Sequence, residues 1–151
     1  MMSGGKSPHV VFADDNDDDY VLLNCAVQKA GLPAVLDRVK DGTELMQYLH
    51  HEGAYAGTTY STPVLVLLDL NMPRKDGREA LREIRSDPVL RALPVVVLTT
   101  SRALEDVQVT YAAGANSFIT KPSEFKNLVA MVEVLKRYWF EVVVLPPSAV
   151  H

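Results

Sequence analysis

Short apolar runs alternate along this chain with stretches that carry apolar residues at helical spacing, and the pattern repeats five times. The runs are rich in β-branched residues and cover 10–13, 34–39, 64–68, 94–98 and 116–120, of which the second and the fifth also contain polar residues. Strands that alternate with helices predict a parallel sheet, because right-handed crossovers place the helices on both faces. Runs that are apolar throughout are typical of strands buried on both faces. We therefore predict an α/β fold with a doubly wound, five-stranded parallel sheet.

The stretches between the runs predict helices over about 20–29, 43–49, 78–85, 103–113 and 123–138. The first helix carries its apolar residues at Val21, Leu22, Cys25, Ala26 and Ala30. This spacing makes Cys25 a small core residue in our prediction. In the last helix we expect the residues that face the core to be Phe125, Leu128, Val129, Val132 and Leu135.

Composition limits the classes of function that this chain can have. Its 151 residues are 48% hydrophobic and 23% charged, which is typical of one globular domain. The net charge of −4 and the lack of a basic stripe argue against binding to nucleic acid or to an acidic membrane surface. No apolar run approaches the roughly 20 residues that span a bilayer, and the start of the chain lacks the apolar core of a signal peptide. With a single cysteine, no intramolecular disulfide can form, and we expect a cytoplasmic protein.

Polar residues follow four of the five apolar runs. Asp14 and Asp15 follow the first, Asp69 the third, Thr99 the fourth and Lys121 the fifth. The carboxyl ends of neighbouring parallel strands lie about 5 Å apart, so these side chains are expected to converge. Carboxylates that close repel one another unless a cation lies among them, and oxygen ligands of this kind suit Mg²⁺. A lysine and a hydroxyl beside them would complete a phosphoryl-binding pocket, in which an aspartate can act as the nucleophile.

Together these residues resemble the receiver domain of two-component response regulators, a flavodoxin-like (βα)5 fold. The resemblance covers about residues 8–138. It implies that Asp69 is the phosphoacceptor and that Mg²⁺ is held by Asp14, Asp15, Asp69 and the backbone carbonyl of Asn71. Within the acid pair, Asp15 resembles the direct ligand and Asp14 the one that acts through water.

The same resemblance gives roles to residues at the far side of the site. Thr99 is similar to the switch hydroxyl, Phe118 to the switch aromatic residue and Lys121 to the phosphate-binding lysine. Lys121-Pro122 matches a family dipeptide that often has a cis bond. Asn71 and Ser101 stand where the family tunes the lifetime of the acyl phosphate. The resemblance thus implies a phosphoacceptor switch that is no enzyme beyond phosphotransfer to itself and slow autodephosphorylation.

A narrower resemblance is to the stand-alone response regulators of bacterial and cyanobacterial phytochromes. It rests on the lengthened segment from His50 to Thr62, on Thr99-Thr100-Ser101, and on the Tyr-Trp-Phe and Leu-Pro-Pro sequences near the end of the chain. It implies a single-domain regulator whose partner is a sensor histidine kinase, with a phytochrome as the candidate, and whose output passes through protein contacts.

Residues 139–151 form an apolar tail. The tail is either part of the same domain, packed back on it, or a dimer contact, because an exposed patch of this size marks a contact surface. Our hypothesis is a homodimer that uses the last helix and the tail.

Two other functions stay open. A phosphatase with an aspartyl-phosphate intermediate would want a second acid two residues after Asp69, where this chain has Asn71. A constitutive interaction module would never be phosphorylated, but unused clustered carboxylates would cost it stability. The further acids Asp17, Asp18 and Asp19 are interpreted as a solvated helix start that interacts favourably with the helix dipole.

Overall fold

The computed structural model describes residues 7–58, 60 and 62–147 and confirms the α/β fold. Five parallel strands form one sheet in the order β2-β1-β3-β4-β5. They are β1 (His9–Ala13), β2 (Val35–Val39), β3 (Leu65–Leu68), β4 (Val95–Thr99) and β5 (Ser117–Thr120). The central strands β3 and β4 are buried along their whole length, as expected for strands covered on both faces.

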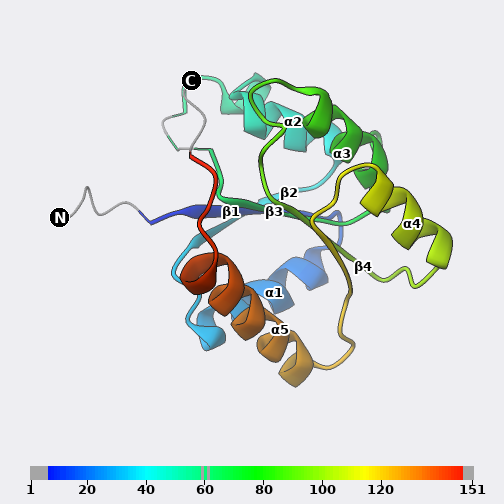
Figure 1. The fold of residues 1–151 in the computed structure, drawn as a ribbon. Helices are drawn as coiled ribbons and strands as arrows, with labels where there is room; N and C mark the ends of the chain where they lie inside the picture. Colours follow the sequence, from blue (N-terminus) through cyan, green and yellow to red (C-terminus); the bar gives the residue numbers. More distant parts are fainter. Residues whose placement is uncertain (1–6, 59, 61, 148–151) are drawn as a thin grey trace.

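Five α-helices cover the two faces of the sheet. They are α1 (Asp17–Ala30), α2 (Gly42–His50), α3 (Gly77–Ser86), α4 (Leu104–Ala112) and α5 (Phe125–Arg137). Helices α1 and α5 pack together on one face, and α2, α3 and α4 lie on the other (Figure 1). Short helical turns at Gly53–Tyr55 and Tyr138–Val142 complete the structure. Each face therefore encloses its own apolar cluster against the sheet.

Polar caps fix where three of the helices begin. The side chains of Asn16, Asp41 and Asp76 each accept a hydrogen bond from the backbone amide three residues on. Helix α1 ends at Gly31, whose backbone is left-handed at φ 71°. Asn16 is important for the site, because this cap fixes the position of the first turn of α1 relative to the carboxyl ends of the strands.

Parts of the predicted core are wrong. Val21, Leu22 and Cys25 are exposed, because the buried face of α1 is formed by Leu23, Ala26, Val27 and Ala30. Since Cys25 lies about 200° around the helix from Leu23, it points away from the sheet. Phe125 is 39% exposed, because it is the first residue of α5 and precedes the turns that pack on the core. The other four predicted positions of α5 are buried or pack partly buried against the core.

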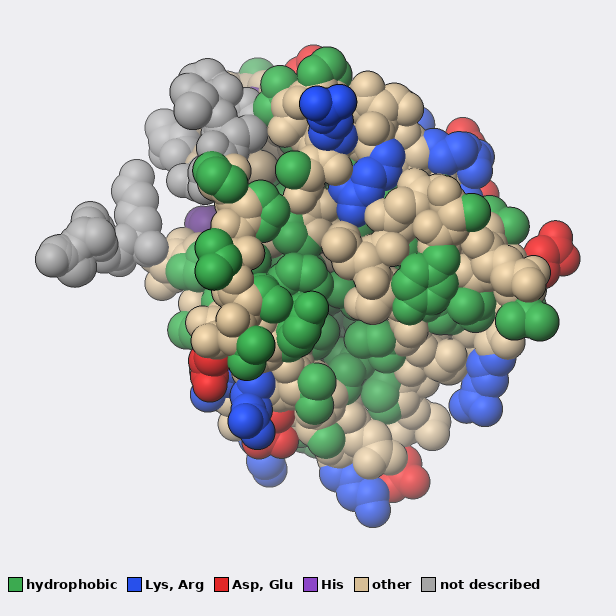
Figure 2. All heavy atoms as spheres, viewed as in Figure 1, with side chains coloured by type: hydrophobic (Ala, Val, Ile, Leu, Met, Phe, Trp, Pro, Cys, Tyr) green, Lys and Arg blue, Asp and Glu red, His purple; other side chains and the backbone are tan. Residues whose placement is uncertain are grey.

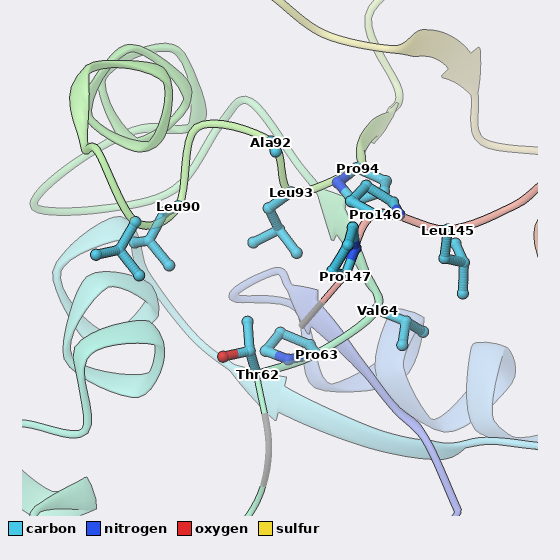
Figure 3. Close-up of a pocket in the computed structure, with 11 residues that line it drawn as sticks. Thr62, Pro63, Val64, Leu90, Ala92, Leu93, Pro94, Leu145, Pro146 and Pro147 are labelled. Carbon is cyan, nitrogen blue, oxygen red and sulfur yellow. The ribbon is translucent and has the colours of Figure 1, made fainter. Parts of the chain in front are cut away.

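Part of the described tail packs on its own domain. Trp139 and Phe140 are partly buried against the cluster between α1, α5 and the sheet. Leu145 then reaches the amino ends of β3 and β4, where it lines a small apolar cavity with Pro63 and Pro94 (Figure 3). Residues 148–151 of the predicted tail lie outside the described residues. Among the residues that the structure describes, no helix is long and apolar enough to cross a membrane.

Candidate functional site

The predicted site residues meet at the carboxyl end of the sheet. Asp14 directly follows β1 and Asp69 follows β3, and both are buried, at 0% and 6% exposure. Backbone hydrogen bonds run one residue past each strand, from the Asp14 amide to Val39 and from the Asp69 amide to Ala13. These bonds extend the ladder and hold both acids in register, so their side chains are placed by the sheet itself.

Three carboxylates come close enough to share one cation. One oxygen from each of Asp14, Asp15 and Asp69 lies within 4.8 Å of the others. Burial raises the pKa of the Asp14 carboxyl above its ordinary value, and its hydrogen bonds with Lys121 and the Asn16 amide oppose that rise only in part. A hard divalent cation would stabilise the ionised form of such a group, and carboxylate oxygens are the ligands it prefers. The acidic cluster therefore fits a divalent cation.

Lys121 provides the positive charge of the site. It follows β5, and its side chain is only 12% exposed. The ammonium donates hydrogen bonds to Asp14, to Asp19 at 2.6 Å and to Asp69 at 3.3 Å. Burial disfavours the charged form, but the bonds to Asp14 and Asp19 and the charge of Asp69 outweigh it and raise the pKa of Lys121. Lys121 is therefore a fixed cation at neutral pH.

Asp19 is the residue that the sequence interpretation missed. Its first-turn neighbour Asp17 is exposed, as expected at a solvated helix start, and forms an ion pair with Arg38 at 2.8 Å. Asp19, in contrast, contacts Lys121. One signal could have found it: Asp19 lies three residues after the cap Asn16, where a helical side chain leans back toward the amino terminus and the strand ends.

Thr99 is the last residue of β4 and is fully buried. Its Oγ1 has no hydrogen-bond partner among the described residues. A buried hydroxyl without a partner costs free energy and is uncommon, so it needs an explanation. A phosphoryl oxygen arriving beside Asp69 is a group that this hydroxyl could bond.

The loop after β4 is fastened to the neighbouring helices. Ser101 donates to Asp106 of α4 at 2.6 Å, and Arg78 of α3 donates to the other oxygen of the same carboxylate at 2.6 Å. On β5, Phe118 is partly buried against the core, and its backbone amide donates to the Tyr111 hydroxyl at 3.1 Å. A movement of Thr99 would therefore pull on contacts with both α3 and α4.

The loop after Asp69 is shaped by a close backbone approach. A Cβ atom on Gly77 would lie 2.2 Å from the Asp69 carbonyl oxygen, so only glycine fits there. The Asn71 amide lies 3.4 Å from Asp69 Oδ1, the long end of a hydrogen bond. The described residues contain no cis peptide bond, so Lys121-Pro122 is trans and the expected cis bond is wrong.

Several proteins with a similar sequence and fold are response regulators. Residues 10–133 match the model of the response regulator receiver domain. Response regulator Rcp1 of Synechocystis sp. is 37% identical over 149 residues, which cover 98% of this chain and 100% of Rcp1. A solved Mn²⁺-bound form of Rcp1 has a TM-score of 0.82 at 37% identity, covering 92% of this chain and 99% of that one.

Two further solved structures with this fold are response regulators of bacterial light signalling. The phosphorylated cyanobacterial phytochrome response regulator RcpA is 39% identical with a TM-score of 0.85, covering 93% of this chain and 99% of RcpA. Response regulator RPA3017, in red light signalling of R. palustris, is 34% identical with a TM-score of 0.85, covering 92% and 98%. The match to the family model and these relatives show that the chain belongs to the response regulator receiver domain family.

Proposed function

We propose that this protein is a phosphorylation-controlled switch that accepts a phosphoryl group on Asp69 from a phosphohistidine of a sensor histidine kinase. The observation that carries the proposal is the placement of Asp69, which lies beside two further carboxylates, with the Lys121 ammonium at 3.3 Å. A carboxylate in such surroundings can act as a nucleophile toward phosphorus, and the neighbouring ammonium can stabilise the charge on the phosphoryl group.

The residues that would hold Mg²⁺ are Asp14, Asp15 and Asp69, together with the backbone carbonyl of Asn71. Their oxygen atoms suit Mg²⁺, and the solved Mn²⁺-bound form of Rcp1 supports a divalent cation in this family. When bound, the ion supplies charge neutralisation among the carboxylates and polarisation of the phosphoryl oxygens.

In the transfer step, an Asp69 carboxylate oxygen forms a bond to phosphorus while the phosphorus–nitrogen bond to the donor imidazole breaks. The bonding electron pair leaves with the imidazole nitrogen, which takes up a proton. Lys121 donates to a phosphoryl oxygen, and Thr99 gains a partner for its buried hydroxyl. Both interactions stabilise the negative charge on the phosphoryl oxygens once the phosphoryl group is beside Asp69.

The signal would follow from the movement of Thr99. A new bond to the phosphoryl group favours a conformation in which Thr99 has shifted and Phe118 has turned inward. Because Ser101 and Asp106 join the loop after β4 to α4, that shift changes the face formed by α4, β5 and α5.

A phytochrome-type kinase is the donor that the relatives favour. RcpA is a phytochrome response regulator and RPA3017 acts in red light signalling. The supporting observation is that each match extends over more than nine-tenths of this chain.

A homodimer through α5 and the tail is the proposed assembly. Val134, Tyr138, Val142 and Val144 are 50–97% exposed although hydrophobic. Hydrophobic side chains also gather on the face that Figure 2 shows. We expect truncation after Arg137 to reduce the mass measured by light scattering from dimer to monomer; an unchanged mass would contradict the dimer.

The phosphatase alternative is disfavoured by Asn71, because its amide cannot transfer a proton to a leaving group. The constitutive module is disfavoured by the free energy that Asp14, Asp69 and the unpartnered Thr99 hydroxyl cost the fold.

The test is phosphorylation by a small phosphodonor, with and without Mg²⁺, followed by intact mass. We expect a gain of one phosphoryl group that requires Mg²⁺ and is absent in Asp69→Asn. Asp18→Asn is the control, since it removes an exposed acid of α1. A wild-type protein that gains no mass even with a histidine kinase would overturn the proposal in favour of the constitutive module.

A further inference from the structure

Asp19 lies in the first turn of α1, outside the group of three carboxylates that could share a cation. Its Oδ2 accepts a hydrogen bond from the Lys121 ammonium at 2.6 Å, and its side chain is 32% exposed. The bond joins residues that are 102 positions apart in the sequence. Nothing in the chemistry of the cation cluster requires an acid here, so Asp19 needs a role of its own.

A closed ring of hydrogen bonds fixes the Asp19 carboxylate. Asp14 Oδ1 accepts from the Asn16 amide at 2.8 Å, and the Asn16 side chain accepts from the Asp19 amide at 2.9 Å. The Asp19 side chain then accepts from Lys121, which donates back to the other oxygen of Asp14. Because the helix cap is one link of the ring, the start of α1 and the end of β5 are held together through Asp19.

The ammonium of Lys121 has three protons and three carboxylate partners. The bond to Asp69, at 3.3 Å, is the longest of the three. It is therefore the bond that a phosphoryl oxygen on Asp69 would replace at least cost. Asp14 is also one of the acids that would hold the cation, whereas Asp19 is free to serve Lys121 alone.

A lysine without an anchor would be a poor partner for a phosphoryl group. Its flexible four-carbon side chain has many rotamers, and this freedom must be lost before the ammonium has one position. In this structure the bond to Asp19 restricts the ammonium before any donor arrives.

We propose that Asp19 is a positioning residue for phosphoryl transfer, which holds the Lys121 ammonium beside Asp69. The role rests on the proposed function of Asp69 as phosphoacceptor. Asp19 itself touches neither the phosphoryl group nor the cation, and it acts only through Lys121.

The experiment compares Asp19→Ala, Asp19→Asn and Asp18→Ala with the wild-type protein. Asp19→Asn removes the charge but keeps an oxygen that can accept from Lys121. Asp18→Ala removes the same charge from the same helical turn, at a residue that is not among the three partners of Lys121. The rate of phosphorylation by acetyl phosphate at saturating Mg²⁺ is measured for each protein.

We expect Asp19→Ala to be about five- to tenfold slower, the effect of losing roughly one charge-assisted hydrogen bond to a partly exposed group. Asp19→Asn and Asp18→Ala should stay within about twofold of wild type. A second readout is the Lys121 side-chain ammonium signal in a ¹H–¹⁵N NMR spectrum, assigned with Lys121→Met. The signal should persist in wild type, Asp19→Asn and Asp18→Ala, and broaden by solvent exchange in Asp19→Ala.

Equal rates for Asp19→Ala and wild type would overturn the role, as would equal slowing by Asp18→Ala, which would mark a simple charge effect. If Asp19→Ala does not fold, Asp19→Ser, which is too short to reach Lys121, replaces it. A wild-type protein that is never phosphorylated would overturn the proposed function itself. A phosphorylated wild type with no loss in Asp19→Ala would overturn only the role of Asp19.

Discussion

The two ends of the same central strands differ in almost every physical respect. At their carboxyl ends, β1, β3 and β4 lead into Asp14, Asp69 and Thr99. These are two buried acids and a buried hydroxyl that has no partner among the residues the structure describes. At their amino ends, β3 and β4 follow Pro63 and Pro94, and the cavity there is lined almost entirely by apolar side chains (Figure 3).

The difference shows that the amino end of the sheet stabilises the fold and that the carboxyl end carries the chemical groups. Burying apolar side chains favours folding, whereas burying acids near one another or leaving a hydroxyl unpaired costs free energy. The carboxyl end therefore contains unfavourable interactions that a cation and a phosphoryl group could relieve. The apolar burial at the amino end helps to offset the free energy that these interactions cost.

The largest expected effect is at the amino end. Leu90 is 1% exposed in the apolar cluster beside β4. Leu90→Ala should lower the free energy of unfolding by about 3 kcal/mol, because it leaves a cavity. Phosphorylation per folded molecule should not change, since the site is at the opposite end. Urea denaturation measures the loss.

The control for Leu90 is its neighbour Val89, which is 52% exposed. Val89→Ala should change the unfolding free energy by no more than about 0.5 kcal/mol. A slower phosphorylation of folded Leu90→Ala would show that the two ends are not independent.

Mg²⁺ should act on the carboxyl end alone. A cation that binds only the folded protein should raise the free energy of unfolding by about 2.7 kcal/mol at roughly a hundred times its Kd. Chemical denaturation with Mg²⁺ or with EDTA measures the effect. Asp15→Asn should lose most of this gain and Asp18→Asn should keep it; equal gains in both would place the ion elsewhere.

Thr99→Val should stabilise the unphosphorylated protein by about 1 kcal/mol, because it removes a buried hydroxyl that no described residue bonds. The same variant should weaken the response to phosphorylation, since the phosphoryl group loses a donor. Thermal unfolding and intact mass together measure both effects.

Thr110 provides a matched comparison for Thr99. It is equally buried, but its hydroxyl donates to the Asp106 carbonyl at 2.7 Å. Thr110→Val should therefore destabilise the fold by about 1 kcal/mol, with the opposite sign to Thr99→Val. If both variants lose stability equally, the Thr99 hydroxyl is not an unfavourable group.

The smallest expected effect is loss of the end of the tail. Leu145 is only partly buried and Pro146 and Pro147 are exposed. Removal of residues 145–151 should lower the unfolding free energy by less than about 1 kcal/mol. Phosphorylation should be unchanged. Calorimetry measures the loss, and a fall of several kcal/mol would make the tail an essential part of the domain.

The sequence predicted most of the site because the end of a strand can be recognised from neighbouring residues alone. Asp14, Asp69, Thr99 and Lys121 each stand where an apolar run stops, and parallel strands bring such points together. The helical contacts were harder to predict. Cys25 was placed inside and Asp19 in solvent, because the pattern did not fix which side of α1 faces the sheet.

The sequence by itself determined the five strands, their parallel arrangement and the polar residues at their ends. The physical reason is that a strand buried on both faces and the side-chain period of a strand or helix can each be recognised from a few neighbouring residues. Tertiary structure alone decided that Asp19, among three neighbouring acids, meets Lys121, and that the Thr99 hydroxyl has no partner within the described part of the chain. It also decided that Leu145 reaches Pro63 and Pro94. These contacts join residues far apart in the chain, and they depend on how each helix is rotated and packed against the sheet.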